Sequence, residues 1–297
     1  MLPIFYIGKR SFFDITRTGV FWVILGLTMI VSFGLLYTGW KKSHEGPFAE
    51  SGQYHQEEFG ADESFETIAM INPRAVLLYF TYGSLIGFAN LLAVFVMMGL
   101  LSRDIDLRRI DMLIARPVSR TQIYIGKLLA GWASIILYLV LATLWCGLVS
   151  IVSGMGYQED LTNAVLKGII APCLVGTVVY MISLYTRSVV AGVIGMVILG
   201  SSNNPGMVMI KMIGLTLLKV KTAIWMLYKM LPPMNVIGQN ATNEILSGLW
   251  KMFVSTMYED LYPIRDDGIY TEMWQVYAYL AVILVIGWIS FAKREFN

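Results

Sequence analysis

Six stretches of the chain are apolar over roughly the 20 residues that a helix needs to cross a lipid bilayer. Of the 297 residues, 57% are hydrophobic and only 14% are charged, whereas soluble domains carry about 25% charged residues. The sequence therefore predicts an all-α polytopic membrane protein with six transmembrane helices, built as a single transmembrane domain over residues 1–297. The six predicted spans are 20–40, 75–101, 128–152, 168–185, 189–209 and 276–291.

Basic residues in the short loops indicate the side of the membrane that each loop faces, because such loops stay in the cytoplasm. The N-terminal segment, the 102–127 loop, the turn at Arg187 and the C-terminal end are all basic, and they share one side if six spans alternate. We therefore expect a multi-pass protein of the cell (inner) membrane with both termini cytoplasmic. Residues 1–19 then form a cytoplasmic interfacial helix, and the acidic 41–75 loop lies outside.

Residues 206–275 carry a second basic stretch, on the side that the alternation places outside. At about 100° per residue, its lysines share one broad face of a helix. An amphipathic helix lying in the membrane interface accounts for this face, and so does a helix that exposes lysines to a central anionic path. We expect an interfacial helix followed by an outer loop that ends at residue 275. The lysines are Lys211, Lys219, Lys221 and Lys229.

The segment 102–127, SRDIDLRRIDMLIARPVSRTQIYIGK, interrupts the apolar runs with charge. Apolar side chains recur in it at spacings of three and four, which places them in one stripe of a helix with a charged rim. A short helix of this kind suits a groove in a partner protein, or it rests on lipid headgroups; the pattern leaves both open. The stripe consists of Leu107, Ile110, Leu113 and Ile114.

This predicted helix has a defined stop, and the next helix has a defined start. Pro117 disfavours the helical conformation of Arg116. Ser119, with Gln122 three residues later, has the pattern of a capping box. A new helix should therefore begin at Ser119 and continue through Lys127 into the third span.

Residues 102–132 resemble the signature of ATP-binding-cassette permeases of the type-2 exporter family. In that family an acidic residue ends span two, a short cytoplasmic coupling helix follows, then an LL…P-[VI]-S-R element, then Gly-Lys at the start of span three. Arg109-Ile110 stands where the family usually has Gly-Thr. The LPPMN element at 231–235 and the basic C-terminal ending agree with the resemblance. The matching positions are Asp104, Leu113, Pro117, Val118, Ser119, Arg120, Gly126 and Lys127.

The resemblance implies a membrane-spanning permease subunit that couples ATP hydrolysis by a separate ABC ATPase subunit to export of an unidentified substrate. ATP and Mg would bind the partner, and this chain would bind no cofactor. The chain has no G-x-x-x-x-G-K-[ST] loop, so we expect it to be no enzyme and to have no catalytic residues. The resemblance assigns the ATPase interface to Asp104, Leu107, Arg108, Arg109, Ile110, Leu113, Ile114, Arg116, Pro117, Arg120 and Lys127.

Small residues in the fifth span allow another helix to approach closely. Type-2 exporter permeases pair through spans one and five, so the resemblance implies that this face packs in a homodimer or a pseudo-symmetric heterodimer. Packing within one subunit is the alternative. The second span has a similar pair, Gly83 and Gly87. The predicted dimer residues are Ser188, Ala191, Gly192 and Gly195.

Other chemistries find little support in the sequence. A net charge of +2 is too small to indicate nucleic-acid binding. Cys146 and Cys173 lie in apolar runs, as buried cysteines do. His44 and His55 stand among carboxylates at spacings that fit no metal-ligand motif, and the 18 methionines are ordinary packing residues, so we expect no metal site. Asn90, in the second span, should hydrogen-bond another helix.

Two further function classes remain open. A membrane-embedded enzyme would need a nucleophile and a base within the spans, but both histidines lie in the predicted outer loop. A non-transporting membrane module would relay the motion of the ATPase to an outer partner, and the long loops leave room for such a contact. An ATPase encoded beside this chain would support the transport and relay readings and disfavour the enzyme.

The predicted topology can be tested by cysteine labelling on intact cells. A cysteine introduced at Ser51 should react with a membrane-impermeant thiol reagent, and one introduced at Ser119 should not, because the basic residues place position 119 in the cytoplasm. Labelling at Ser119 without labelling at Ser51 would overturn the predicted sidedness.

Overall fold

The computed structural model describes residues 2–38, 73–101, 104, 118–202 and 273–293, and every regular element in this part of the chain is helical. By length and composition, five segments could cross a membrane. They correspond to predicted spans one to four and six, which confirms an all-helical, multi-pass membrane protein. The five segments are Gly19–Tyr37, Leu77–Leu100, Arg120–Val152, Glu159–Ile182 and Met273–Lys293.

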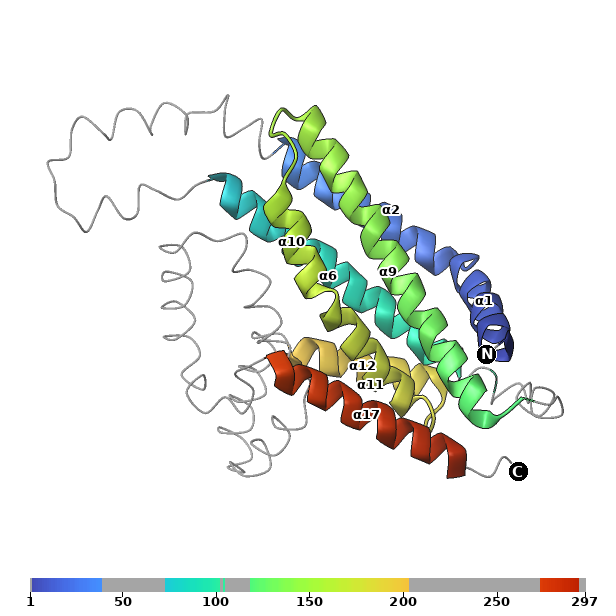
Figure 1. Cartoon of the computed structure of the whole chain (residues 1–297). Coiled ribbons are helices and arrows are strands. Elements are labelled where there is room, and N and C mark those ends of the chain that lie inside the picture. Colours follow the sequence, from blue (N-terminus) through green and yellow to red (C-terminus); the bar gives the residue numbers. More distant parts are fainter. Residues whose placement is uncertain (1, 39–72, 102–103, 105–117, 203–272, 294–297) are drawn as a thin grey trace, which may run out of the picture.

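Helix α6 (Pro73–Leu100) lies at the centre of the bundle (Figure 1). It packs against α2 (Gly19–Phe33), α9 (Arg120–Val152), α11 (Ile170–Ile182) and α12 (Ser188–Ser202). A helix that has neighbours on several sides needs apolar residues around most of its circumference, which is why α6 shows no single apolar stripe.

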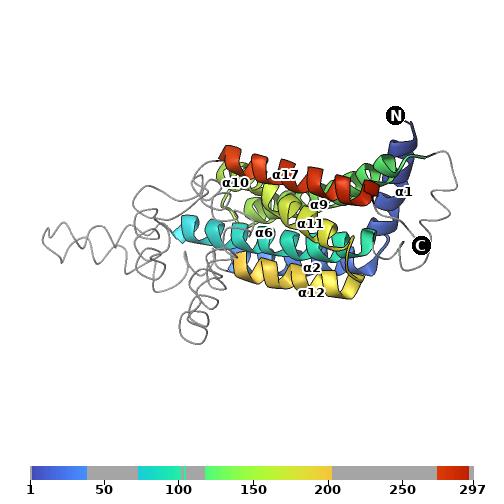
Figure 2. The same ribbon diagram turned by 90° about the horizontal axis from the view of Figure 1, so that it is seen from below.

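One end of the bundle brings several elements together (Figure 2). Helix α1 (Leu2–Thr16) lies across this end, α9 begins there, and α6, α11 and α17 (Met273–Lys293) finish there. We call it the α1 end. At the opposite end, a π-helical turn, η1 (Gly34–Thr38), extends α2.

Helix α12 begins at the α1 end and runs beside α6 and α11 (Figure 2). Its 15 described residues rise by about 22 Å, which is less than the roughly 30 Å of a bilayer core. The remainder of the predicted span 189–209 lies outside the described residues. The same holds for the predicted coupling helix at 105–115 and for most of the 41–75 and 206–275 segments.

The fourth span begins earlier than predicted and is broken in two. Helix α10 (Glu159–Gly168) precedes α11, with the break at Ile169, whereas the sequence placed the start of the span at Gly168. Pro172 accounts for the break, because it has no N–H group to donate to the carbonyl four residues earlier. A Cβ atom on Gly168 would lie 2.6 Å from Oη of Tyr82, so α6 packs directly against the broken turn.

The turn between α9 and α10 depends on two glycines. Gly154 has a φ of 85° and Gly156 a φ of 73°, a backbone region that other residues enter only at a cost. Buried Gln158 closes the turn by donating from Nε2 to the carbonyls of Met155 (2.9 Å) and Gly156 (3.1 Å).

Methionines of α6 fill the spaces beside glycines on neighbouring helices. The side chain of Met97 occupies the position that a Cβ atom on Gly131 of α9 would take, and it would lie 3.0 Å from one on Gly176 of α11. Met98 meets Gly192 of α12 in the same way. The flexible thioether side chain suits these irregular gaps.

The small-residue face of α12 lies inside the subunit. Ala191 is fully buried, and a Cβ atom on Gly195 would lie 2.7 Å from Val179 of α11 and 3.0 Å from Val94 of α6. For Ala191, Gly192 and Gly195 these contacts support packing within one subunit. A dimer that uses α12 would instead meet its exposed face, which includes Val189 and Val193.

We expected Asn90 to form a hydrogen bond to another helix, and among the described residues the structure shows none for its Oδ1. Its side chain is buried in α6, yet Oδ1 has no hydrogen-bond partner within the described part of the chain.

The packing of α12 predicts the effect of Gly195→Leu. The new side chain must displace Val179 or Val94, and overpacking of this kind typically costs about 1–3 kcal/mol. We expect a lower Tm for the purified variant in detergent. Val193→Leu is the matched control: Val193 is 59% exposed on the same helix, so its Tm should not change. Equal Tm values for the two variants would favour the dimer reading of Gly195.

Candidate functional site

Ser119 begins α9 with the capping box that the sequence predicted. Its Oγ accepts from the backbone N–H of Gln122 (3.3 Å), and its own N–H donates to Oε1 of Gln122 (3.1 Å). Two of the N–H groups that a helix start leaves without partners are thereby paired. The start of α9 is therefore fixed at Ser119, which confirms the predicted restart after Pro117.

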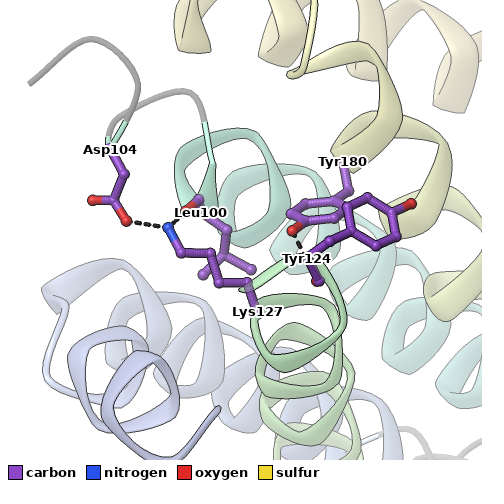
Figure 3. A network of polar contacts seen from close by, with 5 residues as sticks. All are labelled: Leu100, Asp104, Tyr124, Lys127 and Tyr180. Carbon is purple, nitrogen blue, oxygen red and sulfur yellow. Dashed lines mark hydrogen bonds and ion pairs between the residues drawn. The ribbon is translucent and has the colours of Figure 1, made fainter. Parts of the chain in front are cut away.

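Two turns into α9, Lys127 binds the end of α6 (Figure 3). Its Nζ donates to the carbonyl of Leu100 (2.8 Å) and forms an ion pair with the carboxylate of Asp104. The Lys127 side chain is only 3% exposed, whereas that of Asp104 is 23% exposed. A buried ammonium requires such partners, because an unpaired charge away from water is costly.

The position of Lys127 also suits the end of a helix. The last carbonyl groups of a helix have no partners within it, and the partial negative charge there attracts a cation. Lys127 pairs one of these carbonyls, at Leu100, and simultaneously binds Asp104 just beyond the helix. The pair therefore binds Asp104, which comes just before the 105–118 segment, to α9, which begins just after it.

One turn earlier, Tyr124 packs against α11 and α17. Its carbonyl accepts from the hydroxyl of Tyr180 (3.1 Å), and its ring lies 5.2 Å from the Tyr180 ring and 5.7 Å from the Phe291 ring, measured between centroids. Its hydroxyl fills the space beside Gly287 and has no hydrogen-bond partner among the described residues. Tyr180 and Phe291 are fully buried, so this aromatic cluster seals the α1 end.

The first turn of α9 binds α17 through two hydrogen bonds. Nη1 of Arg120 donates to the carbonyl of Ala292 (3.2 Å), and Nε1 of Trp288 donates to Oγ1 of Thr121 (3.0 Å). These bonds join residues more than 160 positions apart in the chain. The end of α17 is thus fixed to the start of α9.

Helix α1 crosses α9 at a pair of glycines. A Cβ atom on Gly8 would lie 3.2 Å from the carbonyl oxygen of Gly126, and one on Gly126 would lie 3.1 Å from the carbonyl oxygen of Ile4. The two backbones therefore approach closely, and the side chain of Ile7 packs beside the contact. Gly126 and Lys127, adjacent in sequence, bind different partners: Gly126 contacts α1, and Lys127 contacts α6.

The first turns of α9 thus contact α1, α6, α11 and α17 at one place. We call residues 119–127 and the partners just described the α9 hub. The hub holds no catalytic constellation, and no group of metal-ligating side chains occurs among the described residues.

A family model described as ABC-2 family transporter protein matches residues 6–296. The chain belongs to the ABC-2 transporter family. Comparison with curated proteins gave no match. The family identifies the chain as a membrane transport module, and ABC-2 permeases generally work with an ATPase partner and the membrane. The resemblance inferred from residues 102–132 is thereby confirmed.

Three of the predicted interface residues of this ABC-2 protein lie in the described part of the chain. Asp104 and Lys127 form the buried pair, and Arg120 binds Ala292. Each therefore has a partner within the subunit. The remaining predicted interface residues lie outside the described residues: Leu107, Arg108, Arg109, Ile110, Leu113, Ile114, Arg116 and Pro117.

Sequence reasoning missed the aromatic half of the hub. Tyr124, Tyr180 and Trp288 carry contacts between helices that are distant in sequence. The sequence offered only a weak indication: Tyr124 lies between the capping box and Lys127, within residues 102–132, which resemble the family signature. Nothing in the pattern indicated its partners.

Replacing Asp104 and replacing Lys127 should lower the free energy of unfolding by different amounts. Asp104→Ala leaves the ammonium of Lys127 buried without its carboxylate, and removing one partner of a buried pair costs about 3–5 kcal/mol. Lys127→Met leaves a carboxylate that reaches water, so we expect only about 1–3 kcal/mol. Unfolding of the purified variants in detergent measures both.

The double variant Asp104→Ala/Lys127→Met should recover much of the stability lost in Asp104→Ala, because no buried charge is left unpaired. Lys293→Met, which removes an exposed cation at the same end of the bundle, is the control and should be near neutral. If the double variant loses as much free energy of unfolding as the two single variants together, Asp104 and Lys127 do not interact as an ion pair.

Proposed function

We propose that this chain is the permease subunit of an ATP-binding-cassette exporter, and that the segment between Asp104 and Ser119 receives the motion of a separate ATPase subunit. ATP and Mg bind that partner. The permease itself contributes no catalytic residue. Two permeases, identical or similar, face each other in the membrane and move an unidentified substrate outward.

The observation that carries this proposal is that the residues at both ends of the segment are held in place. Asp104 is bound by Lys127, and Ser119 is fixed by the capping box of α9. A segment anchored at both ends transmits a push to its anchors rather than absorbing it. A loop without such anchors would change its own conformation instead of moving the helices.

The α9 hub then distributes the motion. Hydrogen bonds from Arg120 and Trp288 carry it to α17, the Tyr124–Tyr180 bond carries it to α11, and the Gly8–Gly126 contact carries it to α1. Packed helices that move as units in this way switch between a small number of arrangements. An alternation between inward-facing and outward-facing states requires this behaviour.

Leu113→Asp tests the receiving segment. An unpaired carboxylate in an apolar contact costs roughly 1–3 kcal/mol or more, so the variant should lose its ATPase on co-purification or should uncouple ATP hydrolysis from transport. It should still insert in the membrane, because the segment lies outside the spans. Arg108→Glu or Arg109→Glu should mainly slow or weaken association with the ATPase.

The matched control is Tyr157→Asp, which adds a carboxylate at the opposite end of the bundle, where Tyr157 is 57% exposed. It should retain the ATPase and full activity. If Leu113→Asp also retains both, the apolar stripe rests on lipid, and the receiving role is wrong. If ATP hydrolysis couples to the permease but no candidate substrate moves, the relay reading replaces transport.

A further inference from the structure

Helix α1 presents a second face that the α9 hub does not use. The face turned toward α9 includes Gly8 and buried Ile15. The opposite face is exposed and mixes two kinds of side chain, aromatic and cationic. Its aromatic members are Phe5 (72% exposed), Tyr6 (64%) and Phe13 (48%), and its cations are Lys9 and Arg10, joined by Arg17 in the turn that follows the helix. We call these six residues the outer face of α1.

The three cations of the outer face outnumber the acidic residues of α1. Lys9, Arg10 and Arg17 form no ion pair with a described residue. Asp14 is the only acidic residue of α1. The outer face is therefore net positive, and its charge is available to an anionic partner.

The level of α1 in the membrane follows from its junction with α2. Nε1 of Trp22, in the first turn of α2, donates to the carbonyl of Thr16 at the end of α1 (2.8 Å), and the Trp22 side chain is 58% exposed. Exposed tryptophans concentrate at the headgroup level of a bilayer. Since α2 is a membrane span, the C-terminal end of α1 lies where hydrocarbon gives way to headgroups.

A helix at this level meets lipid phosphates on its exposed side. Aromatic rings bury their apolar parts at the boundary between headgroups and acyl chains, and lysine and arginine reach outward to the phosphates. A protein partner also buries aromatic rings and pairs with cations. It is therefore the level set by Trp22, at the headgroups, that favours lipid for this face.

We propose that the outer face of α1 binds anionic phospholipid headgroups. The Gly8–Gly126 contact transfers this anchorage to α9, so anionic lipid holds the α9 hub at a fixed depth. This binding does not depend on the proposed exporter function, because it uses residues on the side of α1 away from the hub.

The test uses the full chain, with Cys146 and Cys173 replaced by alanine, in phosphatidylcholine vesicles that contain a minority of phosphatidylglycerol. A bimane label is attached at Tyr6→Cys, and bromine is placed on the acyl chains of only one lipid at a time. Mole for mole, brominated phosphatidylglycerol should quench the label severalfold more than brominated phosphatidylcholine. Each cation near an anionic surface is expected to contribute up to about a fivefold preference.

Four controls make the result specific. A label at Val140→Cys, which is 49% exposed in the middle of α9, should be quenched equally by both lipids. The triple change Lys9→Gln/Arg10→Gln/Arg17→Gln should remove the preference at Tyr6→Cys, as should about 0.5 M NaCl, where the Debye length falls to a few ångströms. Arg187→Gln removes a cation outside α1 and should leave the preference unchanged.

Equal quenching by the two lipids at Tyr6→Cys would overturn the proposal, as would a preference that survives the triple change. Absence of quenching by either lipid would show that the outer face is turned away from the bilayer, which also overturns it. If the triple variant instead loses its ATPase on co-purification and the lipid preference is absent, the face belongs to a protein partner.

Discussion

The buried ammonium of Lys127 is the charge on which the α1 end of the bundle depends. It is held by the last carbonyl of α6, at Leu100, and by the carboxylate of Asp104 just beyond that helix. Because burial without these partners would be costly, α9 cannot rotate or slide against α6 without breaking both interactions together. The ends of the 105–118 segment are thereby held at a fixed separation, and the neighbouring contacts of Tyr124 and Gly126 form around a rigid start of α9.

Farther into the membrane, polar bonds continue to join α9 to its neighbours. Oη of Tyr138 lies 2.5 Å from Oγ1 of Thr28 on α2, and Nε1 of Trp132 donates to Oγ1 of Thr177 on α11 (3.1 Å). Such bonds contribute about 0.6 kcal/mol each on average in membrane bundles. Their sum is modest, but their directions are fixed, so they hold α2, α9 and α11 in register.

The sequence predicted features that are encoded locally. The capping box at Ser119 and the apolar spans arise from residues a few positions apart; the capping box and five of the spans are confirmed. The stop at Pro117 lies outside the described residues. The contacts of Tyr124 could not be predicted, because they join positions that meet only in the folded bundle. Gly195 shows the same limit: small residues four apart indicate a close helix approach, but they do not identify which helix approaches.

Helix α12 is attached to the bundle in a different way. In the part whose side chains the structure describes, no side-chain hydrogen bond joins it to another helix; Met98 packs against Gly192, and Val94 and Val179 pack against Gly195. Packing contacts are non-directional, and a methionine side chain changes rotamer readily, whereas the hub contacts break if their atoms move by an ångström or two. Under the proposed function, a push on the 105–118 segment would therefore move the polar-bonded helices as one body, and the relative motion would fall on the packed interface between that body and α12.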